Sequence, residues 1–302
     1  MVLGDHKEMI DAVEYAIDSG INYFDTARMY GDGLSEIHTG AVLRELDKTD
    51  LIIGTKVRIA GDEFKDISRT IENQIDNSLK RLGIDTIDIV YTHNTIGAER
   101  NVSSGTLSVD DLNSIVKVFE SAVASGKLRY WGFNGLGQTD SVKEALGRYS
   151  PSGIHTCYNM LNPTSGYNLP KTFLYQNYEE LMKLASEEGI GTVGIRILAG
   201  GALSGSLDRH PIAQQNVAPI ATSSTFREDV SRTAVFEILV KEGFVNNLVE
   251  ASVRFAISND NLNTALIGLS NFDQLKQAVD YANQGSLPQE ALDNINEIWA
   301  VS

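Results

Sequence analysis

The sequence contains little of what would mark a secreted or membrane-spanning protein. Its 302 residues include a single cysteine, Cys157, so no disulfide can form within the chain, and a reducing compartment fits this composition. No apolar run approaches the roughly 20 residues that a membrane-spanning helix needs. The N-terminal segment MVLGDHKEM also lacks the apolar stretch of a signal peptide. We therefore expect a cytoplasmic protein.

Basic residues are also in the minority. Twenty-five lysines and arginines stand against 40 aspartates and glutamates, which gives a formal net charge of −15. Nucleic acids and anionic membranes bind basic surfaces, so we expect neither as a partner, although a local basic pocket is compatible with this balance. Cys157 lies in the apolar run GIHTCYNM with no neighbour that would stabilise a thiolate, which predicts a core residue and not a nucleophile.

Short apolar segments alternate with amphipathic stretches along almost the whole chain. The strand candidates are residues 21–27, 51–57, 87–93, 128–134, 153–160, 191–198 and 264–270. Helical patterns lie between them, and several end in glycine, which tolerates the left-handed conformation that follows a helix. Such alternation indicates an α/β protein with a parallel sheet, and this many units favour a (β/α)8 TIM barrel in a single domain over residues 1–302.

A barrel of this type needs eight strands, and the sequence shows candidates for seven. The first would precede the helical pattern that starts near His6, where only residues 1–4 are available. We expect an absent or incomplete first strand, or a barrel completed in another way; a start codon assigned too late would explain the defect. The polar segment 201–250 is too long for a simple turn, and long connections at this end of a barrel usually cover a ligand.

Four polar residues stand at or just beyond the expected ends of strands. Asp25 ends INYFD, Lys56 ends LIIGTK and His93 ends IDIVYTH. Tyr30 follows Asp25 by five residues. A nearly apolar strand that ends in one charged or titratable residue is typical of a buried parallel strand opening onto an active-site face. These side chains therefore predict a shared site at the carboxyl-terminal rim of the barrel.

Together these residue types suit the reduction of a carbonyl by a nicotinamide. That reaction needs a proton donor at the carbonyl oxygen and stabilisation of developing negative charge. Tyrosine can supply the proton, but its unperturbed pKa of about 10 makes it a poor acid-base at neutral pH unless a nearby ammonium favours the phenolate. Lys56 is the candidate for that ammonium, and Asp25 would keep it protonated. His93 would orient the carbonyl or share in proton transfer.

Taken singly, three of the four have simpler explanations. Tyr30 alone would more often be a packing residue, Asp25 a helix cap, and His93 a rim histidine with satisfied hydrogen bonds. Lys56 is harder to explain in this way, because a lysine that follows LIIGT at a strand end is costly unless it is paired. The combination favours a shared site.

On these residues the sequence resembles the aldo-keto reductase family. FDTARMYGDGLSE is similar to the family's FDTAxxYG-SE signature, TKV to its lysine strand, and LGIDTIDIVYTH to the block LGxDYIDLYxxH. Later family blocks are similar to GKLRYWGFNG, CYNML, LAGGALSG and IGLSNFDQL, so the likeness runs from about residue 7 to residue 299. The resemblance implies a (β/α)8 barrel that binds NAD or NADP across its rim, without the GxGxxG motif of Rossmann domains, which is absent here.

The resemblance also implies a role for each matching residue. Tyr30 would be the general acid in reduction and the base in oxidation, assisted by Asp25, Lys56 and His93. Cofactor binding would fall to Asn134, His155, Arg196, Leu198, Gly201, Leu203, Gly205, Gly268, Ser270, Asn271 and Gln274. The backbone N–H groups of residues 201–205 would lie near a phosphate, and Ser270 and Asn271 also resemble a helix N-cap.

Several departures from the family pattern bear on the cofactor. Asn134 and Gly135 replace the usual Ser-Asn, and His155 replaces a glutamine. Arg196 replaces the serine of Ser-Pro-Leu; it would bind a diphosphate or a substrate anion, or pair with a carboxylate of the rim. The segment 269–274 offers no aligned lysine or arginine for the 2′-phosphate of NADP, so we expect NAD to be accepted at least as well.

The expected function is an oxidoreductase that interconverts an aldehyde, ketone or aldose hemiacetal with its alcohol or lactone. GFNG and RILAGG resemble relatives that oxidise aldoses, and the loops 94–108 and 201–244 contain few aromatic residues, which favours a small or polar substrate. Two alternatives stay open. One is a nicotinamide-binding regulatory subunit with little turnover, like the potassium-channel β-subunits of the family. The other is a non-redox barrel enzyme that uses Lys56 as a Schiff-base nucleophile.

Overall fold

The chain forms two compact units of strands and helices. The structure is a computed structural model that describes residues 4–46, 50–170 and 172–301. The first unit comprises residues 1–155 with 188–190, and the second comprises residues 156–187 with 191–302. The single domain expected over residues 1–302 stays a prediction.

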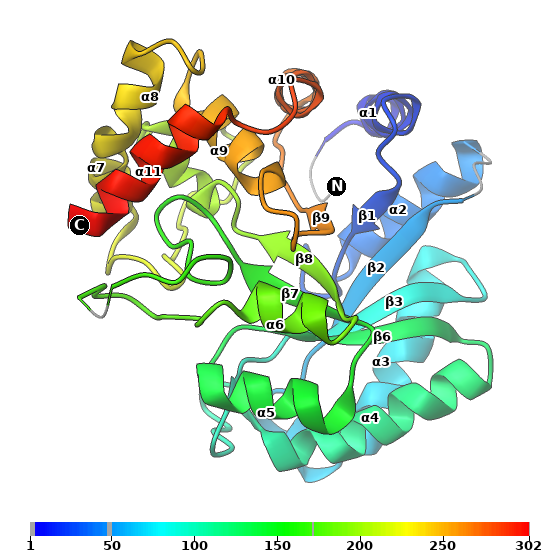
Figure 1. The fold of residues 1–302 in the computed structure, drawn as a ribbon. Coiled ribbons are helices and arrows are strands. Elements are labelled where there is room, and N and C mark those ends of the chain that lie inside the picture. The colour runs from blue at the N-terminus through cyan, green and yellow to red at the C-terminus, as the bar shows by residue number, and fades with distance from the viewer. Residues whose placement is uncertain (1–3, 47–49, 171, 302) are drawn as a thin grey trace. The chain divides into compact units, whose positions relative to one another are not determined.

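The first unit contains a parallel sheet. Its strands are β1 (Tyr23–Asp25), β2 (Ile52–Val57), β3 (Ile87–Thr92), β6 (Leu128–Asn134) and the first part of β7 (Gly153–Cys157). They pair in the order β1-β2-β3-β6-β7, each parallel to its neighbour, and Figure 1 shows the first four as successive arrows coloured from blue to green. The predicted strands and their parallel pairing are confirmed in this unit.

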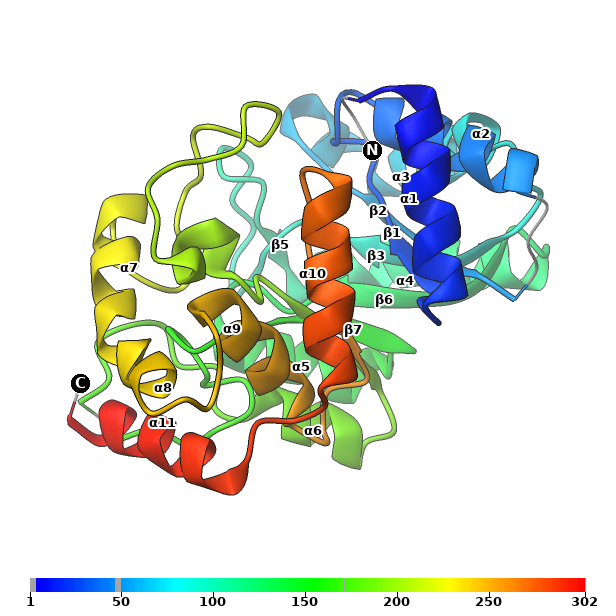
Figure 2. The same ribbon diagram turned by 90° about the horizontal axis from the view of Figure 1, so that it is seen from above.

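Helices cover one face of that sheet. They are α1 (His6–Asp18), α2 (Leu34–Leu46), the 3-10 helix η1 (Gly61–Lys65), α3 (Ile67–Leu82), α4 (Val109–Ala124) and α5 (Thr139–Tyr149). Each α-helix contacts the next along the chain, as Figure 2 shows for α1 and α2. In α3 the carboxylate of Asp66 accepts the N–H of Arg69 at the start, and Gly83 ends the helix at a φ of 68°. Local sequence thus sets both ends of this helix.

Alternate residues of each strand face opposite sides of the sheet. On one side, Trp131 of β6 stacks on Phe119 of α4 at 6.0 Å and packs against Phe133. The other side carries Tyr23 and Tyr91, whose rings need the space left by glycines. A Cβ atom at Gly54 would lie 2.7 Å from the Tyr23 hydroxyl, and one at Gly132 would lie 2.6 Å from the Tyr91 ring.

The loop expected at residues 94–108 has structure of its own. It contains a two-stranded parallel sheet of β4 (Ile96–Gly97) and β5 (Leu107–Ser108). The buried amide of Asn94 donates to the carbonyl oxygens of Ile59 at 2.8 Å and Gly105 at 2.6 Å, and accepts the Ile59 N–H at 2.9 Å. These bonds tie the loop to the residues that follow β2.

The second unit contains β8 (Gly191–Ile195) and β9 (Thr264–Ala265), which pair in parallel. Its longer helices are α6 (Leu181–Glu187), α9 (Leu248–Ile257), α10 (Phe272–Asn283) and α11 (Gln289–Val301). Strands were expected at the positions of β8 and β9, and helices at those of α6, α9 and α10. No helix was expected at α11, where the indole N–H of Trp299 donates to the Met160 carbonyl at 2.9 Å.

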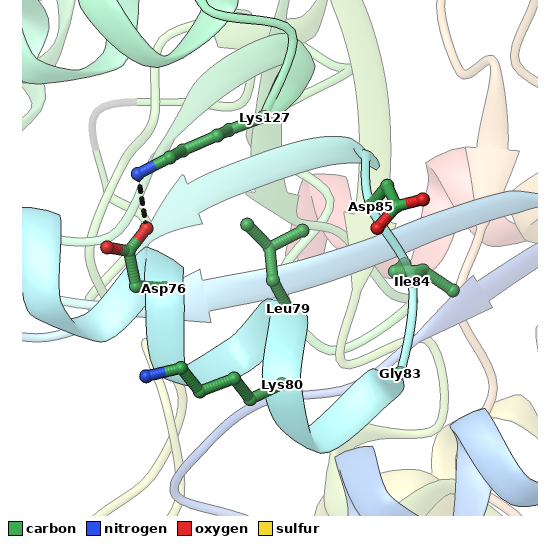
Figure 3. Close-up of a pocket in the computed structure, with 7 residues that line it drawn as sticks. All are labelled: Asp76, Leu79, Lys80, Gly83, Ile84, Asp85 and Lys127. Carbon is green, nitrogen blue, oxygen red and sulfur yellow. Dashed lines mark hydrogen bonds and ion pairs between the residues drawn. The ribbon is translucent and has the colours of Figure 1, made fainter.

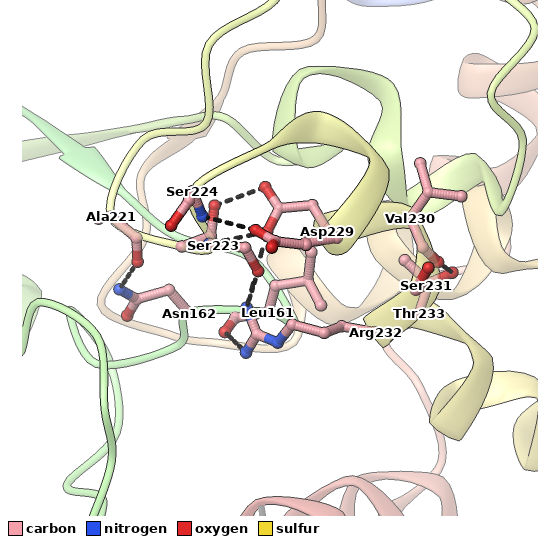
Figure 4. A network of polar contacts seen from close by, with 12 residues as sticks. Leu161, Asn162, Ala221, Ser223, Ser224, Asp229, Val230, Ser231, Arg232 and Thr233 are labelled. Carbon is pink, nitrogen blue, oxygen red and sulfur yellow. Dashed lines mark hydrogen bonds and ion pairs between the residues drawn. The ribbon is translucent and has the colours of Figure 1, made fainter.

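The polar segment 201–250 contains several short helices, and residues 205–225 between them form no helix. The helices are the 3-10 helix η2 (Ala199–Ser204), α7 (Phe226–Arg232), the 3-10 helix η3 (Thr233–Glu237) and α8 (Ile238–Lys241). Figure 4 shows the polar network that holds it: the carboxylate of buried Asp229 accepts the Ser223 N–H at 2.9 Å and lies 3.7 Å from the Arg232 guanidinium. Arg232 also donates to the Leu161 carbonyl at 3.2 Å. The expected irregular connection therefore contains a compact, hydrogen-bonded part.

The first strand was expected to be absent or incomplete, and its place falls on residues 1–4, of which 1–3 lie outside the described residues. Among the residues that the structure describes, no helix is long and apolar enough to cross a lipid bilayer.

Candidate active site

The acid and the lysine predicted for the site form a buried ion pair in the first unit. Asp25 ends β1 and Lys56 lies near the end of β2, with 13% and 3% of their side chains exposed. The Lys56 ammonium donates to Oδ2 of Asp25, and to the carbonyl oxygen of Thr26 at 2.9 Å. The strand register pairs Asp25 with Gly54, two residues before Lys56, so both side chains leave the same face of the sheet.

The Asp25 carboxylate is only partly satisfied. Its second oxygen, Oδ1, is buried and has no hydrogen-bond partner among the residues that the structure describes. Burial raises the pKa of Asp25 above its usual value, and the Lys56 ammonium opposes that shift. Asp25 therefore holds one ammonium and retains an acceptor for a further donor.

Tyr30 lies in the turn between β1 and α2 with 39% of its surface exposed. Gly31 and Gly33 adopt φ values of 62° and 90°, which glycine tolerates, and let the chain reverse around the tyrosine. The Lys56 ammonium lies 5.0 Å from the centroid of the Tyr30 ring, within the range of a cation–π contact. The phenol thus combines a solvent-exposed surface with a buried cation at its ring.

His93 follows β3 and completes the group. Its backbone N–H donates to the Val57 carbonyl at 2.7 Å, and its ring lies 6.0 Å from the ring of Tyr30 at an angle of 84°. Burial, assisted by the positive charges of Lys56 and Arg58, lowers the pKa of His93 to about 4. The imidazole is therefore neutral at pH 7, and its buried Nδ1 has no hydrogen-bond partner within residues 4–46, 50–170 and 172–301. The structure brings all four predicted side chains together, and their catalytic roles stay a prediction.

Asn134, predicted to bind the cofactor, lies at the end of β6 beside His93. Its amide donates to the His93 carbonyl at 3.3 Å and accepts the N–H of Leu136 at 3.3 Å. The adjacent Gly135 donates to the His155 carbonyl at 2.8 Å, and a Cβ atom at Gly135 would overlap that same carbonyl oxygen. Close approach of β6 to β7 therefore explains why glycine follows Asn134.

His155, the other predicted cofactor residue of this unit, lies on β7 with 2% of its surface exposed. Its ring stacks on Tyr91 with 3.9 Å between centroids, and its Nε2 lies 3.9 Å from Oδ1 of Asp25. Burial, with Lys56 and His93 nearby, lowers the pKa of His155 well below its usual value. His155 is thus a neutral imidazole next to the Asp25 carboxylate.

The cofactor residues predicted in the second unit lie in two segments, one after β8 and one at the start of α10. Arg196, Leu198, Gly201, Leu203 and Gly205 follow β8, where Arg196 has a φ of 61°. The N–H groups of Gly201 and Leu203 donate to the Leu198 carbonyl and that of Gly205 to the Ala202 carbonyl, so these three N–H groups already bond within the turn. Binding of a phosphate by residues 201–205 stays a prediction.

The second segment joins β9 to α10 and contains Gly268, Ser270 and Asn271, and Gln274 lies in the first turn of α10. Asn271 is the N-cap of α10, since its side-chain oxygen accepts the N–H of Gln274 at 2.9 Å, and the Gln274 side chain accepts the N–H of Ser270 at 2.7 Å. The N-cap expected here is confirmed for Asn271. The cofactor roles of these residues stay a prediction.

A second buried ion pair of the first unit was not foreseen. Glu36 on α2 is fully buried, and its two carboxylate oxygens accept hydrogen bonds at 2.6 Å from the hydroxyl of Thr55 and from Nε of Arg81. Thr55 precedes Lys56 and faces the opposite side of β2. The only signal in the sequence is the glutamate that ends FDTARMYGDGLSE, which the strand pattern leaves unexplained.

Two further features lie outside this site. Cys157 is fully buried, and burial raises the pKa of its thiol to about 12, which supports its interpretation as a core residue. Figure 3 shows a surface hollow of about 500 Å³ lined by Asp76, Leu79, Lys80, Gly83, Ile84, Asp85 and Lys127. Its residues precede β3 and β6, whereas the candidate site lies where β1, β2 and β3 end, so the hollow is a separate feature.

Comparisons with known proteins bear on the assignment. The model of the aldo/keto reductase family matches residues 4–300. The chain is 24% identical over 298 residues to the L-galactose dehydrogenase of Arabidopsis thaliana, covering 96% of this chain and 84% of that protein.

Solved structures show the same fold. The holo form of the aldo-keto reductase AKR11C1 from Bacillus halodurans is 23% identical with a TM-score of 0.72, over 100% of this chain and 90% of that chain. An aldo-keto reductase from Klebsiella pneumoniae in complex with NADPH is 19% identical with a TM-score of 0.68, over 98% and 86% of the two chains. The predicted (β/α)8 barrel class is thereby confirmed. The chain belongs to the aldo/keto reductase family, and it is an oxidoreductase of that family.

Proposed function

We propose that this protein is an NAD(P)-dependent oxidoreductase that interconverts a carbonyl compound with its alcohol, or an aldose hemiacetal with its lactone. The observation that carries the proposal is the exposed Tyr30 phenol beside the buried Lys56–Asp25 pair, with neutral His93 next to it. General acid–base catalysis needs an accessible proton donor whose ionised form is stabilised, and this group supplies both.

In this proposal Tyr30 gives its proton to the carbonyl oxygen in reduction and takes it back in oxidation. The Lys56 ammonium stabilises the phenolate that remains, and Asp25 keeps that ammonium protonated although it is buried. His93 hydrogen-bonds the carbonyl oxygen as a neutral imidazole, because burial and the adjacent cations disfavour its charged form. In this proposal Tyr30 transfers the proton, and Lys56, Asp25 and His93 stabilise the charges that the transfer creates.

The residues present fit a nicotinamide dinucleotide as the hydride carrier. When bound, that group supplies or accepts the hydride. Asn134 is a hydrogen-bonding side chain next to His93 and would hold the carboxamide. Binding of the phosphates and the adenosine by Arg196, Ser270 and Asn271 is proposed from the sequence resemblance alone. With no cation aligned for a 2′-phosphate at 269–274, NAD is accepted at least as well as NADP.

The substrate class we favour is a small polar carbonyl compound or an aldose. The loops 94–108 and 201–244 contain three aromatic residues, Phe226, Phe236 and Phe244, and all three pack into or against the core of the second unit. A large apolar substrate would therefore find few partners there. The likeness to an L-galactose dehydrogenase supports a sugar as substrate.

A panel of aldehydes, ketones and aldoses tests the proposal. Cofactor absorbance is followed with NADH and NADPH for reduction, and with NAD and NADP for oxidation. We expect turnover with at least one substrate, and a kcat/KM for NADH at least equal to that for NADPH. Cofactor binding without turnover would indicate a regulatory subunit instead. Borohydride trapping of a substrate on Lys56 would indicate Schiff-base chemistry and contradict the proposal.

A further inference from the structure

In the described part of the first unit, two buried atoms that lack a hydrogen-bond partner lie close to each other. They are Oδ1 of Asp25 and Nε2 of His155, which lie 3.9 Å apart. Buried polar groups are usually satisfied, and an isolated one costs free energy. The two atoms are complementary, because an imidazole N–H is a donor and a carboxylate oxygen is an acceptor.

The imidazole is held in that position by packing. His155 lies on β7, and its ring stacks on Tyr91 of β3 with an interplanar angle of 30°. The Tyr91 hydroxyl accepts from Tyr23 of β1 at 3.4 Å. Gly132 of β6 leaves the space that the Tyr91 ring fills. Four strands thus build a tight layer that directs Nε2 of His155 toward Asp25.

The charges of the layer favour a neutral donor at this place. In the first unit the titratable groups that face His155 are Asp25 from β1, Lys56 from β2, and Tyr91 and His93 from β3. Asp25 and Lys56 already balance each other, so a second cation would be uncompensated in a buried space. A neutral imidazole with its proton on Nε2 supports the carboxylate without adding charge.

We propose that His155 is a positioning residue for Asp25: its Nε2–H points to Oδ1 and fixes the carboxylate that holds Lys56 beside Tyr30. The inference deepens the proposed function and rests on it. At 3.9 Å the interaction is that of a dipole with a charge, and it becomes a hydrogen bond when the two atoms approach by about 1 Å. Hydrogen bonds of catalytic groups are often long before substrate binds and shorten in the complex.

The proposal gives His155 a different task from direct contact with the cofactor. Loss of the Nε2–H would leave Asp25 with Lys56 alone, and burial would then raise the pKa of Asp25 further. Since Asp25 must be ionised to hold the ammonium, activity would be lost at a higher pH as the solution is acidified. Binding of the nicotinamide and of the carbonyl substrate would change little.

Two substitutions separate these roles. His155→Leu removes the donor and keeps most of the volume, whereas His155→Gln keeps an N–H donor. Ile154→Val is the matched control, because Ile154 is buried on the opposite face of the same strand. For His155→Leu we expect kcat at pH 7 to fall about tenfold and the acidic limb of the kcat profile to move up by about one pH unit. Dissociation constants for the nicotinamide and the KM of the carbonyl stay within about twofold.

The conservative variant completes the kinetic test. His155→Gln should retain kcat within about threefold, with the acidic limb unmoved. A nicotinamide dissociation constant that rises tenfold with kcat unchanged in His155→Leu would overturn the proposal in favour of a cofactor ligand. Equal loss of kcat in both variants would overturn it in favour of a packing role.

Nitrogen-15 NMR of the imidazoles in the wild-type chain needs no turnover. It should show His155 neutral at pH 7 with its proton on Nε2, and Asp25→Asn should shift that resonance. A proton on Nδ1, or a charged ring at pH 7, would overturn the proposal. Absence of turnover in the wild type would instead contradict the proposed function, and the NMR result would still decide the role of His155.

Discussion

Two ion pairs of the first unit, Asp25–Lys56 and Glu36–Arg81, have largely buried carboxylates that are satisfied to different degrees. At Glu36–Arg81, both oxygens of the fully buried carboxylate accept short hydrogen bonds. At Asp25–Lys56, one carboxylate oxygen has no partner in the described part of the chain, and the ammonium lies 5.0 Å from the ring of exposed Tyr30. Both oxygens of Glu36 therefore have partners. Oδ1 of Asp25 can still accept a hydrogen bond, and the solvent-exposed Tyr30 lies next to the ammonium of that pair.

The difference separates a structural pair from one that can act on a ligand. A buried ion pair gains little net stability from its charges, so a satisfied pair chiefly specifies how neighbouring elements pack. Glu36 and Arg81 lie on α2 and α3, which contact each other. An incompletely satisfied pair stabilises the fold less, but its charge can shift the pKa of an adjacent side chain and so support catalysis. Substitutions in the two pairs should therefore affect different measurable quantities.

Lys56→Met should have the largest effect, on rate. Without the ammonium nothing stabilises the Tyr30 phenolate, so we expect kcat for the best carbonyl substrate to fall by about 1000-fold. The measurement is cofactor oxidation at saturating substrate. Arg81→Met is the control from the other pair, and its kcat per folded molecule should stay within about threefold. Comparable loss in both variants would remove the distinction between the pairs.

Glu36→Gln should have its effect on stability. It leaves the Arg81 guanidinium without its counter-charge, and breaking such a buried pair costs about 3 kcal/mol. Urea unfolding at pH 7 measures the change in the free energy of unfolding. The comparison fails if this variant is as stable as the wild type, or if its kcat falls as far as that of Lys56→Met.

His93 predicts how stability depends on pH. Its pKa is about 4 when folded, against an ordinary value of 6.5 for histidine, so the unfolded state takes up the proton first on acidification. The free energy of unfolding should therefore fall between pH 6.5 and pH 4, by about 3 kcal/mol from this residue, and be unaffected by it above pH 7.

The check is a series of urea unfolding curves for wild type and His93→Gln. His155 contributes in the same direction to both proteins and cancels in the difference. If the two proteins lose stability in parallel between pH 6.5 and pH 4, the neutral state assigned to His93 in the fold is wrong.

Gly135→Ala should have the smallest effect. The added Cβ overlaps the His155 carbonyl, so β6 and β7 must separate slightly, at a cost of about 1–2 kcal/mol. Gly147→Ala on α5 is the matched control, because open space surrounds that position and alanine favours a helix by roughly 0.5–1 kcal/mol. Thermal unfolding gives the melting temperatures of both variants, and we expect a lower value for Gly135→Ala than for Gly147→Ala. Equal melting temperatures would show that the contact between the strands is loose.

Much of the fold and the core of the site could be predicted from the sequence. Strand periodicity places Asp25, Lys56 and His93 at adjacent ends of parallel strands, because such strands carry their carboxyl ends on one side. The partnership of Glu36 with Arg81 could not be predicted in this way. It depends on how α2 packs on α3 across 45 residues, and neither helix pattern encodes its partner.

Short-range patterns also failed where helices are short or lie near the end of the chain. α7 and α8 have 7 and 4 residues, too few for an apolar periodicity to stand out. The position of His155 was predicted, but its contact with Asp25 was not. That contact depends on Tyr91 filling the space above Gly132, which is a matter of three-dimensional packing.

The central claim is that the Tyr30 hydroxyl delivers and removes the proton at the reacting oxygen. The most direct test is kcat of Tyr30→Phe on the best substrate, measured together with the dissociation constant of the reduced nicotinamide. The account predicts a fall in kcat of at least about 100-fold with the dissociation constant unchanged. A Tyr30→Phe protein that turns over at the wild-type rate would contradict it.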